Sequence, residues 1–179
     1  MNRIFIVTGP TNSGKSRFLG QIVSALQAAK IRVGGFIADK HFTENHDYFY
    51  ELRDVQSGKS IPLSSREYTE GWIRIGKFFF NPGAVAFWSE LLSGLKNKSA
   101  DLIVIDEIGP FELEDMMWAG AISYLLAATD LPMIWVVRTR LVEPVLSKWR
   151  ISKPVIIDIN KDSASLTVKQ ILSKLAAKH

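Results

Sequence analysis

The chain contains 179 residues, and its 22 basic and 18 acidic side chains give a formal net charge of +4. Apolar residues make up 47% of the chain and aromatic residues 11%, which suffices for a core of single-domain size and excludes a disordered polyelectrolyte. Cysteine is absent, so disulfide scaffolds, thiolate zinc sites and cysteine nucleophiles are excluded, and a cytoplasmic location is expected. We expect a single domain spanning residues 1–179.

Membrane association and nucleic-acid binding are not expected from the composition. The longest apolar stretch, residues 116–128, is shorter than the roughly 20 residues that a membrane-spanning helix needs. The first residues have neither the apolar length nor the cleavage site of a signal peptide. The positive charge is spread along the chain without a dense basic block, so a phosphate-bearing ligand explains it as well as nucleic acid does.

The order of the predicted elements indicates an α/β fold. Residues 3–8 are a short apolar, β-branched run typical of a buried parallel strand, and apolar side chains then recur at helical spacing from Ser16 to Ala29. Between residues 36 and 80 the period changes to two, which indicates an antiparallel β insertion with strands near 36–38, 48–52, 61–63 and 73–75. Helices are then predicted at 84–95, 116–128, 142–149 and 165–177, and strands at 102–105, 133–137 and 155–159. This alternation predicts three layers around a mainly parallel sheet.

One segment matches a phosphate-binding loop in full. Its pattern is G-x-x-x-x-G-K-[ST], and it reads Gly9-Pro10-Thr11-Asn12-Ser13-Gly14-Lys15-Ser16. The segment lies between a predicted strand and a predicted helix, where loop amides and the helix dipole converge on a polyphosphate. We expect Lys15 to bridge the β- and γ-phosphates, Ser16 to bind Mg²⁺, and Asn12 to adopt a positive φ in place of glycine.

A second carboxylate is expected at the end of a neighbouring buried strand, where it helps to hold Mg²⁺. The apolar run at residues 102–105 ends in Asp106, which fits this role. The side chain of the next residue, Glu107, is expected to point in a different direction from that of Asp106. It can orient a water molecule in line with the γ-phosphate or accept a proton from that water. This pair of carboxylates favours hydrolysis over transfer to an alcohol.

The motifs together resemble a known family. In chain order they are Gly9 to Ser16, Gly35-Phe36, Ile75-Gly76-Lys77-Phe78, Ile105-Asp106-Glu107-Ile108-Gly109-Pro110-Phe111-Glu112-Leu113 and Asn160-Lys161-Asp162. This set, spread over about residues 3–175, resembles the small P-loop nucleoside-triphosphatase family that includes the thermostable and cancer-related nucleoside-triphosphatases. The Asp-Glu-Ile-Gly-x-x-Glu-Leu signature is the specific part, since many families share the phosphate loop.

The resemblance implies a fold and an activity. The fold is a P-loop fold of the Glu-next-to-Walker-B subclass, in which an extra strand separates the phosphate-loop strand from the Asp-Glu strand. The activity is Mg²⁺-dependent hydrolysis of ATP, GTP and other nucleoside triphosphates, with loose base selectivity. The chain departs from the family pattern at Pro110-Phe111, where Lys-Met is usual, and at Asn160-Lys161, where Asn-Arg is usual.

Arg138 is the remaining catalytic candidate. If residues 133–137 form the inserted central strand, its carboxyl end lies beside the γ-phosphate, and Arg138 follows that strand directly. Our hypothesis is that Arg138 senses the γ-phosphate or stabilises its developing charge.

Three alternative functions remain. A guanine-reading switch needs an N-K-x-D motif, but position 163 is Ser and Asp162 comes one residue early. A nucleoside or small-molecule kinase could recruit Arg138, Arg140 and Arg150 around the transferred phosphate. A nucleotide-gated nucleic-acid-binding module would use as phosphate contacts Arg53, Lys59, Arg66, Arg74, Lys77, Lys148, Arg150 and Lys153. The Phe78-Phe79-Phe80 run is expected to pack in the core or the insertion rather than to stack on bases.

Overall fold

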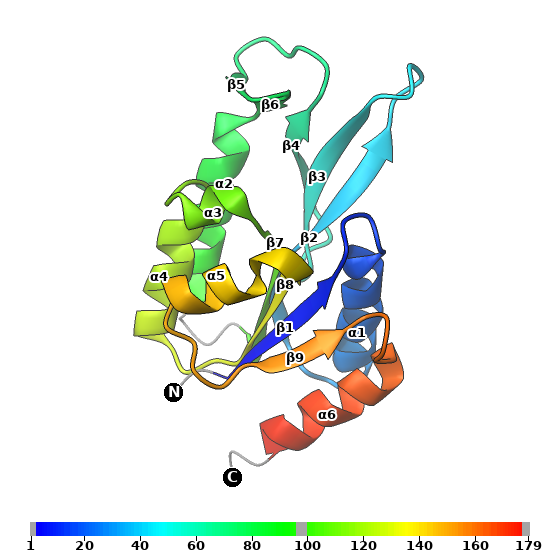
Figure 1. Ribbon diagram of the computed structural model, residues 1–179, viewed down its shortest axis with the longest axis vertical. Coiled ribbons are helices and arrows are strands. Elements are labelled where there is room, and N and C mark those ends of the chain that lie inside the picture. Colours follow the sequence, from blue (N-terminus) through cyan, green and yellow to red (C-terminus); the bar gives the residue numbers. More distant parts are fainter. Residues whose placement is uncertain (1–2, 96–99, 177–179) are drawn as a thin grey trace.

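The computed structural model describes residues 3–95 and 100–176, and its strands form one nine-stranded sheet (Figure 1). The strands are β1 (Ile4–Gly9), β2 (Val33–Phe42), β3 (Tyr48–Asp54), β4 (Ser60–Ser65), β5 (Ile73–Ile75), β6 (Phe78–Phe80), β7 (Leu102–Ile108), β8 (Met133–Arg138) and β9 (Val155–Asp158). The helices are α1 (Lys15–Ala28), α2 (Pro82–Gly94), α3 (Pro110–Leu113), α4 (Ala119–Ala128), α5 (Val142–Lys148) and α6 (Ala164–Ala176), with a 3₁₀ turn, η2 (Thr139–Leu141).

The sheet joins a parallel part to an antiparallel part in the order β5-β6-β4-β3-β2-β7-β8-β1-β9. Strands β2, β7, β8, β1 and β9 pair in parallel, while β3, β4, β6 and β5 continue the sheet by antiparallel pairing. Strand β2 belongs to both parts, because residues 33–36 pair with β7 and residues 36–42 pair with β3. Strand β8 lies between β7 and β1, so the segment after Asp106 and the end of β8 are neighbours.

Helices cover both faces of the parallel part, with α1 and α6 on one face and α2, α4 and α5 on the other (Figure 1). Alternate residues of β1 therefore enter different cores: Ile4 and Ile6 pack on the α2 and α4 side, and Phe5 and Val7 on the α1 side. Burial on both faces explains why the parallel strands are uninterrupted apolar runs. None of the described helices combines the length and the apolar character needed to cross a membrane.

Several predicted boundaries are wrong for local reasons. Strand β2 begins at Val33 and not near residue 36 as predicted, so Gly34 and Gly35 lie inside it. Gly35 has φ of 104°, and a Cβ there would lie 1.9 Å from the Val104 carbonyl oxygen, so the close approach of β2 and β7 requires glycine. The helix predicted from Met116 begins only at Ala119, since Met117 has a positive φ of 52°.

Two short elements were not predicted from periodicity. The four-residue helix α3 follows the Asp-Glu strand directly, and its single turn is too short to show a helical period. The phenylalanine run at 78–80 forms strand β6, in which Phe80 is buried in the core. The predicted end of the last helix, at residue 177, lies outside the described residues.

Candidate active site

The P-loop (residues 9–16) connects β1 to α1 through a tight turn. Asn12 has φ of 57°, which confirms that it adopts the left-handed conformation, and Gly14 has φ of 89°. The Ser13 hydroxyl donates a hydrogen bond of 2.7 Å to the Pro10 carbonyl oxygen. The loop therefore curves around its own backbone immediately before the N-terminus of a 14-residue helix, which is the arrangement that binds anions.

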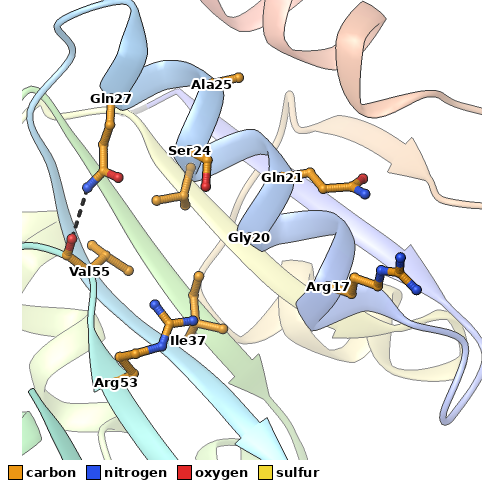
Figure 2. Close-up of a pocket in the computed structure, with 10 residues that line it drawn as sticks. Arg17, Gly20, Gln21, Ser24, Ala25, Gln27, Ile37, Arg53 and Val55 are labelled. Carbon is orange, nitrogen blue, oxygen red and sulfur yellow. Dashed lines mark hydrogen bonds between the residues drawn. The ribbon is translucent and has the colours of Figure 1, made fainter. Parts of the chain in front are cut away.

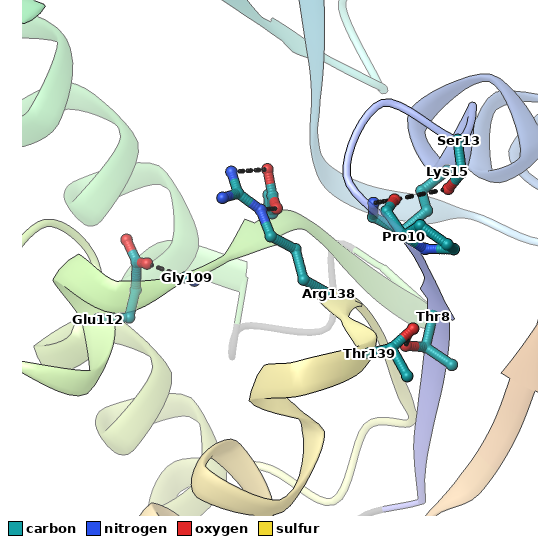
Figure 3. Close-up of polar contacts among 9 residues, drawn as sticks. Thr8, Pro10, Ser13, Lys15, Gly109, Glu112, Arg138 and Thr139 are labelled. Carbon is teal, nitrogen blue, oxygen red and sulfur yellow. Dashed lines mark hydrogen bonds and ion pairs between the residues drawn. The ribbon is translucent and has the colours of Figure 1, made fainter.

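Lys15 is buried inside this turn. Its Nζ donates a hydrogen bond of 2.6 Å to the Pro10 carbonyl oxygen (Figure 3). Burial is the main cause that lowers the pKa of Lys15, and the nearby carboxylates of Glu107 and Asp106 oppose that effect. A buried ammonium group next to two carboxylates is placed to neutralise negative charge at the loop.

Asp106 lies in β7 and is 1% exposed. Its Oδ2 accepts a hydrogen bond of 3.1 Å from the Ala38 backbone N–H, whereas its buried Oδ1 has no hydrogen-bond partner within the described ranges. Burial raises the pKa of Asp106 to about 7, although hydrogen bonds from Ser16 and Ala38 act in the opposite direction. A buried carboxylate oxygen without a partner, next to a serine hydroxyl, fits a hard divalent cation, which takes oxygen ligands.

Glu107 and Arg138 form an ion pair at the carboxyl ends of β7 and β8. Arg138 Nε lies 2.5 Å from Glu107 Oε1, and a second guanidinium nitrogen lies 3.4 Å from Oε2. The hydrogen bond to Glu107 is the main cause that raises the pKa of Arg138. In the view of Figure 3, the Arg138 side chain lies between the P-loop residues on one side and Gly109 and Glu112 on the other. The two predicted catalytic side chains therefore contact each other, with Glu107 held in place by a two-point contact.

Most of the predicted site residues line one cavity of about 430 Å³, which we call the phosphate cavity. Those that line it are Thr11, Asn12, Ser13, Gly14, Lys15, Ser16, Asp106, Glu107 and Arg138, whereas Gly9 and Pro10 lie at the base of the loop. The cavity is also lined by Lys40 of β2 and Tyr50 of β3, which no sequence motif marked, and by Arg53 of β3, which was expected only as a phosphate contact of the nucleic-acid alternative. Burial raises the pKa of Tyr50. Of these three residues only Tyr50 lies in a strand predicted from the period-two pattern, and that pattern carries no signal for the cavity.

A larger depression of about 680 Å³ runs along α1 beside β2 and β3 (Figure 2). Gln27 Nε2 crosses it to donate a hydrogen bond of 2.9 Å to the Val55 carbonyl oxygen. Its lining includes Arg17 and Arg53 but no acidic or histidine side chain from the described residues, so it supplies no general base. The larger volume therefore does not mark the chemical centre.

The residues after β9 build a turn and do not form a base-reading motif. Asp162 Oδ2 accepts a hydrogen bond of 2.8 Å from the Asp158 backbone N–H, and Lys161 Nζ lies 3.6 Å from Asp158 Oδ2. Since the Asp162 carboxylate is engaged in the turn, this geometry agrees with the spacing argument against a guanine-specific switch.

Some cations proposed for the nucleic-acid alternative have carboxylate partners. Lys148 Nζ lies 2.6 Å from Asp115 Oδ1, and Arg53 Nε lies 2.7 Å from Asp39 Oδ2. These pairs reduce the positive charge available to a phosphate backbone.

Comparison with known proteins identifies the family. A family model described as NTPase matches residues 4–172. The chain belongs to this NTPase family. It is 28% identical over 167 residues to the nucleoside-triphosphatase THEP1 of Methanothermobacter thermautotrophicus, covering 93% of this chain and 94% of that protein. With the THEP1 of Sulfolobus acidocaldarius the identity is 26% over 178 residues, covering 98% and 94% of the two chains.

Solved structures show the same fold. The solution structure of a human cancer-related nucleoside triphosphatase superposes with a TM-score of 0.71 at 19% identity, covering 99% of both chains. The crystal structure of THEP1 from Aquifex aeolicus superposes with a TM-score of 0.70 at 20% identity, covering 96% of this chain and 98% of that one.

Proposed function

We propose that this NTPase-family protein hydrolyses nucleoside 5′-triphosphates to the diphosphate and phosphate, with Mg²⁺ as cofactor. The observation that carries the proposal is the convergence of Lys15, Asp106 and Glu107 on the phosphate cavity. The position of β8 between β1 and β7 supports assignment to the Glu-next-to-Walker-B subclass, with residues 36–80 as its antiparallel insertion.

Binding of the triphosphate is assigned to the P-loop and Lys15. The loop amides and the N-terminus of α1 face the β- and γ-phosphates, and Lys15 adds a full positive charge there. Ser16 and Asp106 would hold Mg²⁺, which supplies neutralisation of phosphate charge when it is bound. Asp162 is engaged in a turn, which supports loose base selectivity.

Hydrolysis is assigned to Glu107 and Arg138. Glu107 orients a water molecule and accepts its proton while the water oxygen bonds to the γ-phosphorus and the bond from that phosphorus to the β,γ-bridging oxygen breaks. Arg138 fixes the Glu107 carboxylate through two contacts and places positive charge beside the transferring group.

Phosphate release from ATP, GTP, CTP and UTP, with and without Mg²⁺, tests the proposal. Glu107→Gln removes the base, and Glu114→Gln, at an exposed glutamate beyond α3, is the matched control. We expect Mg²⁺-dependent release from all four nucleotides, a loss of about 10²- to 10⁴-fold in kcat for Glu107→Gln, and no change for the control. Wild-type turnover in Glu107→Gln would refute the role of Glu107, and release from a single nucleotide would refute loose selectivity.

A further inference from the structure

A second cavity of about 430 Å³ adjoins the phosphate cavity, and the proposed binding of the triphosphate assigns no role to the residues that line it outside the shared junction. The two cavities share Asp106, Glu107 and Arg138, and the second extends from there to α3, β4 and β6. One attacking water needs about 30 Å³, whereas pockets for small organic molecules measure about 300–1,000 Å³. The second cavity, which we call the acceptor cavity, has the size of a ligand site.

Aromatic side chains form much of its wall. They are Tyr48, Tyr50, Phe78, Phe80, Phe111 and Trp118. The rings of Phe80 and Phe111 are in edge-to-face contact with centroids 5.3 Å apart, and so are those of Tyr48 and Phe78, at 5.8 Å. Such rings offer both edges and faces to a planar ligand, and stacking of this kind tolerates different ring systems.

Two lysines give the acceptor cavity a positive charge. Lys40 Nζ lies 3.9 Å from the centre of the Tyr48 ring, and Lys77 Nζ lies 5.9 Å from that of Phe78. Across the described segments, neither lysine has a carboxylate within 4.0 Å. Of the carboxylates in the wall, Glu107 contacts Arg138 and Glu112 accepts a hydrogen bond from the Gly109 backbone N–H, while Asp106 is the one assigned to Mg²⁺. The charge therefore favours an anionic ligand.

An unpartnered donor also lies in this wall. Trp118 is 4% exposed, and its indole Nε1–H has no acceptor in the part of the chain that the structure describes. The buried hydroxyl group of Ser64 is a second polar group in the same cavity.

We propose that the acceptor cavity binds a nucleoside 5′-monophosphate, whose phosphate receives the γ-phosphoryl group in competition with water. The aromatic wall takes the planar base, and Lys40, which lines both cavities, draws the monophosphate towards Glu107 and Arg138. A monophosphate oxygen bonds to the γ-phosphorus, the bond to the β,γ-bridging oxygen breaks, and any proton on the attacking oxygen passes to Glu107. The triphosphate and the monophosphate thereby become two diphosphates.

This inference rests on the proposed function, because both reactions use the same triphosphate and the same cavity junction. The test therefore follows both products of one reaction. The protein is incubated with Mg²⁺ and γ-³²P-ATP, alone and with AMP, GMP, CMP or UMP, and labelled phosphate is separated from labelled diphosphate. Lys77→Ala probes the acceptor cavity, since Lys77 lines it but not the phosphate cavity. Lys59→Ala, at an exposed lysine of the same antiparallel region, is the matched control.

We expect labelled diphosphate with at least one monophosphate. In Lys77→Ala the KM for that monophosphate should rise about tenfold, as loss of a charged contact predicts, while phosphate release without an acceptor stays at the wild-type rate and shows that the variant is folded. Lys59→Ala should match the wild type in both reactions. Phosphate release without labelled diphosphate from any monophosphate overturns the acceptor site and leaves hydrolysis standing. Transfer with an unchanged KM in Lys77→Ala overturns its placement in this cavity, and absence of both products overturns the proposed function as well.

Discussion

Glu112 is a carboxyl group in an almost completely buried environment, and its titration should control part of the stability of the protein. The side chain is 3% exposed, and its Oε2 accepts a hydrogen bond of 2.7 Å from the Gly109 backbone N–H. Burial is the main cause that raises the pKa of Glu112 from 4.5 to about 8, although that hydrogen bond lowers it. The folded protein therefore keeps the proton over a pH range in which the unfolded chain releases it.

The sign of the pH effect follows from this difference. Because the folded pKa is raised, the contribution of Glu112 to the free energy of unfolding falls as the pH rises from 4.5 to about 8. At about 1.4 kcal/mol per pH unit, the loss between pH 5 and pH 7 is roughly 2–3 kcal/mol. Glu112→Gln keeps an acceptor oxygen for Gly109 but cannot ionise. On going from pH 5 to pH 7, the free energy of unfolding of the variant should therefore rise by roughly 2–3 kcal/mol relative to that of the wild type.

Urea unfolding of the wild type and Glu112→Gln at pH 5 and pH 7, with a chelator present, measures this change. Comparing the two proteins at each pH cancels the titration of all other groups, including Asp106. Glu114→Gln is the matched control, because Glu114 lies two residues away and is exposed. If the stability difference between Glu112→Gln and the wild type is the same at both pH values, the carboxyl group is not held protonated by burial.

Two further predictions concern the backbone and the ion pair. Gly35→Ala should lower the free energy of unfolding by about 3 kcal/mol or more in urea titrations, because its Cβ would meet the Val104 carbonyl oxygen at a positive φ. Gly120→Ala, in α4 with open space around it, should be neutral or slightly stabilising, and equal losses in both variants would refute the close-approach argument. Arg138→Ala should lower single-turnover phosphate release about 10²-fold, and Arg138→Lys should not restore it because an ammonium group cannot span both oxygens of Glu107. An unchanged rate in Arg138→Ala removes Arg138 from the mechanism.

The parallel part of the sheet and the P-loop could be predicted because their signals are local. Strands buried on both faces are continuous apolar runs, such as residues 102–105 and 133–137, and these runs appear as β7 and β8. The left-handed conformation of Asn12 follows from a loop that needs positive φ where glycine is absent. The family resemblance implied an extra strand beside the Asp-Glu strand, and Arg138 was placed at the end of that strand on this condition. Strand β8 does pair with β7, so Arg138 and Glu107 lie at the same edge of the sheet.

The rest depended on contacts that no local pattern encodes. Two consecutive glycines such as Gly34 and Gly35 are typical of a turn between elements. Only their pairing with β7 shows that they are part of a strand. Arg138 was expected to face the γ-phosphate, and the sequence carried no signal for its ion pair with Glu107. The acceptor cavity requires β4 and β6 to lie beside α3, and this placement comes from the long-range pairing of β3, β4 and β6.

The sheet topology explains how one fold can direct the γ-phosphoryl group either to water or to a second ligand. The parallel strands fix Asp106, Glu107 and Arg138 at one edge, because β7 and β8 are adjacent. Strand β2 continues past that edge and pairs with β3, so Lys40 of β2 and Tyr50 of β3 line the same junction. The chemistry at phosphorus is thus fixed by the parallel part. Whether the attacking oxygen belongs to water or to a monophosphate depends on the ligand that the antiparallel part binds. Substitutions in that part should therefore change the ratio of transfer to hydrolysis more than they change triphosphate binding.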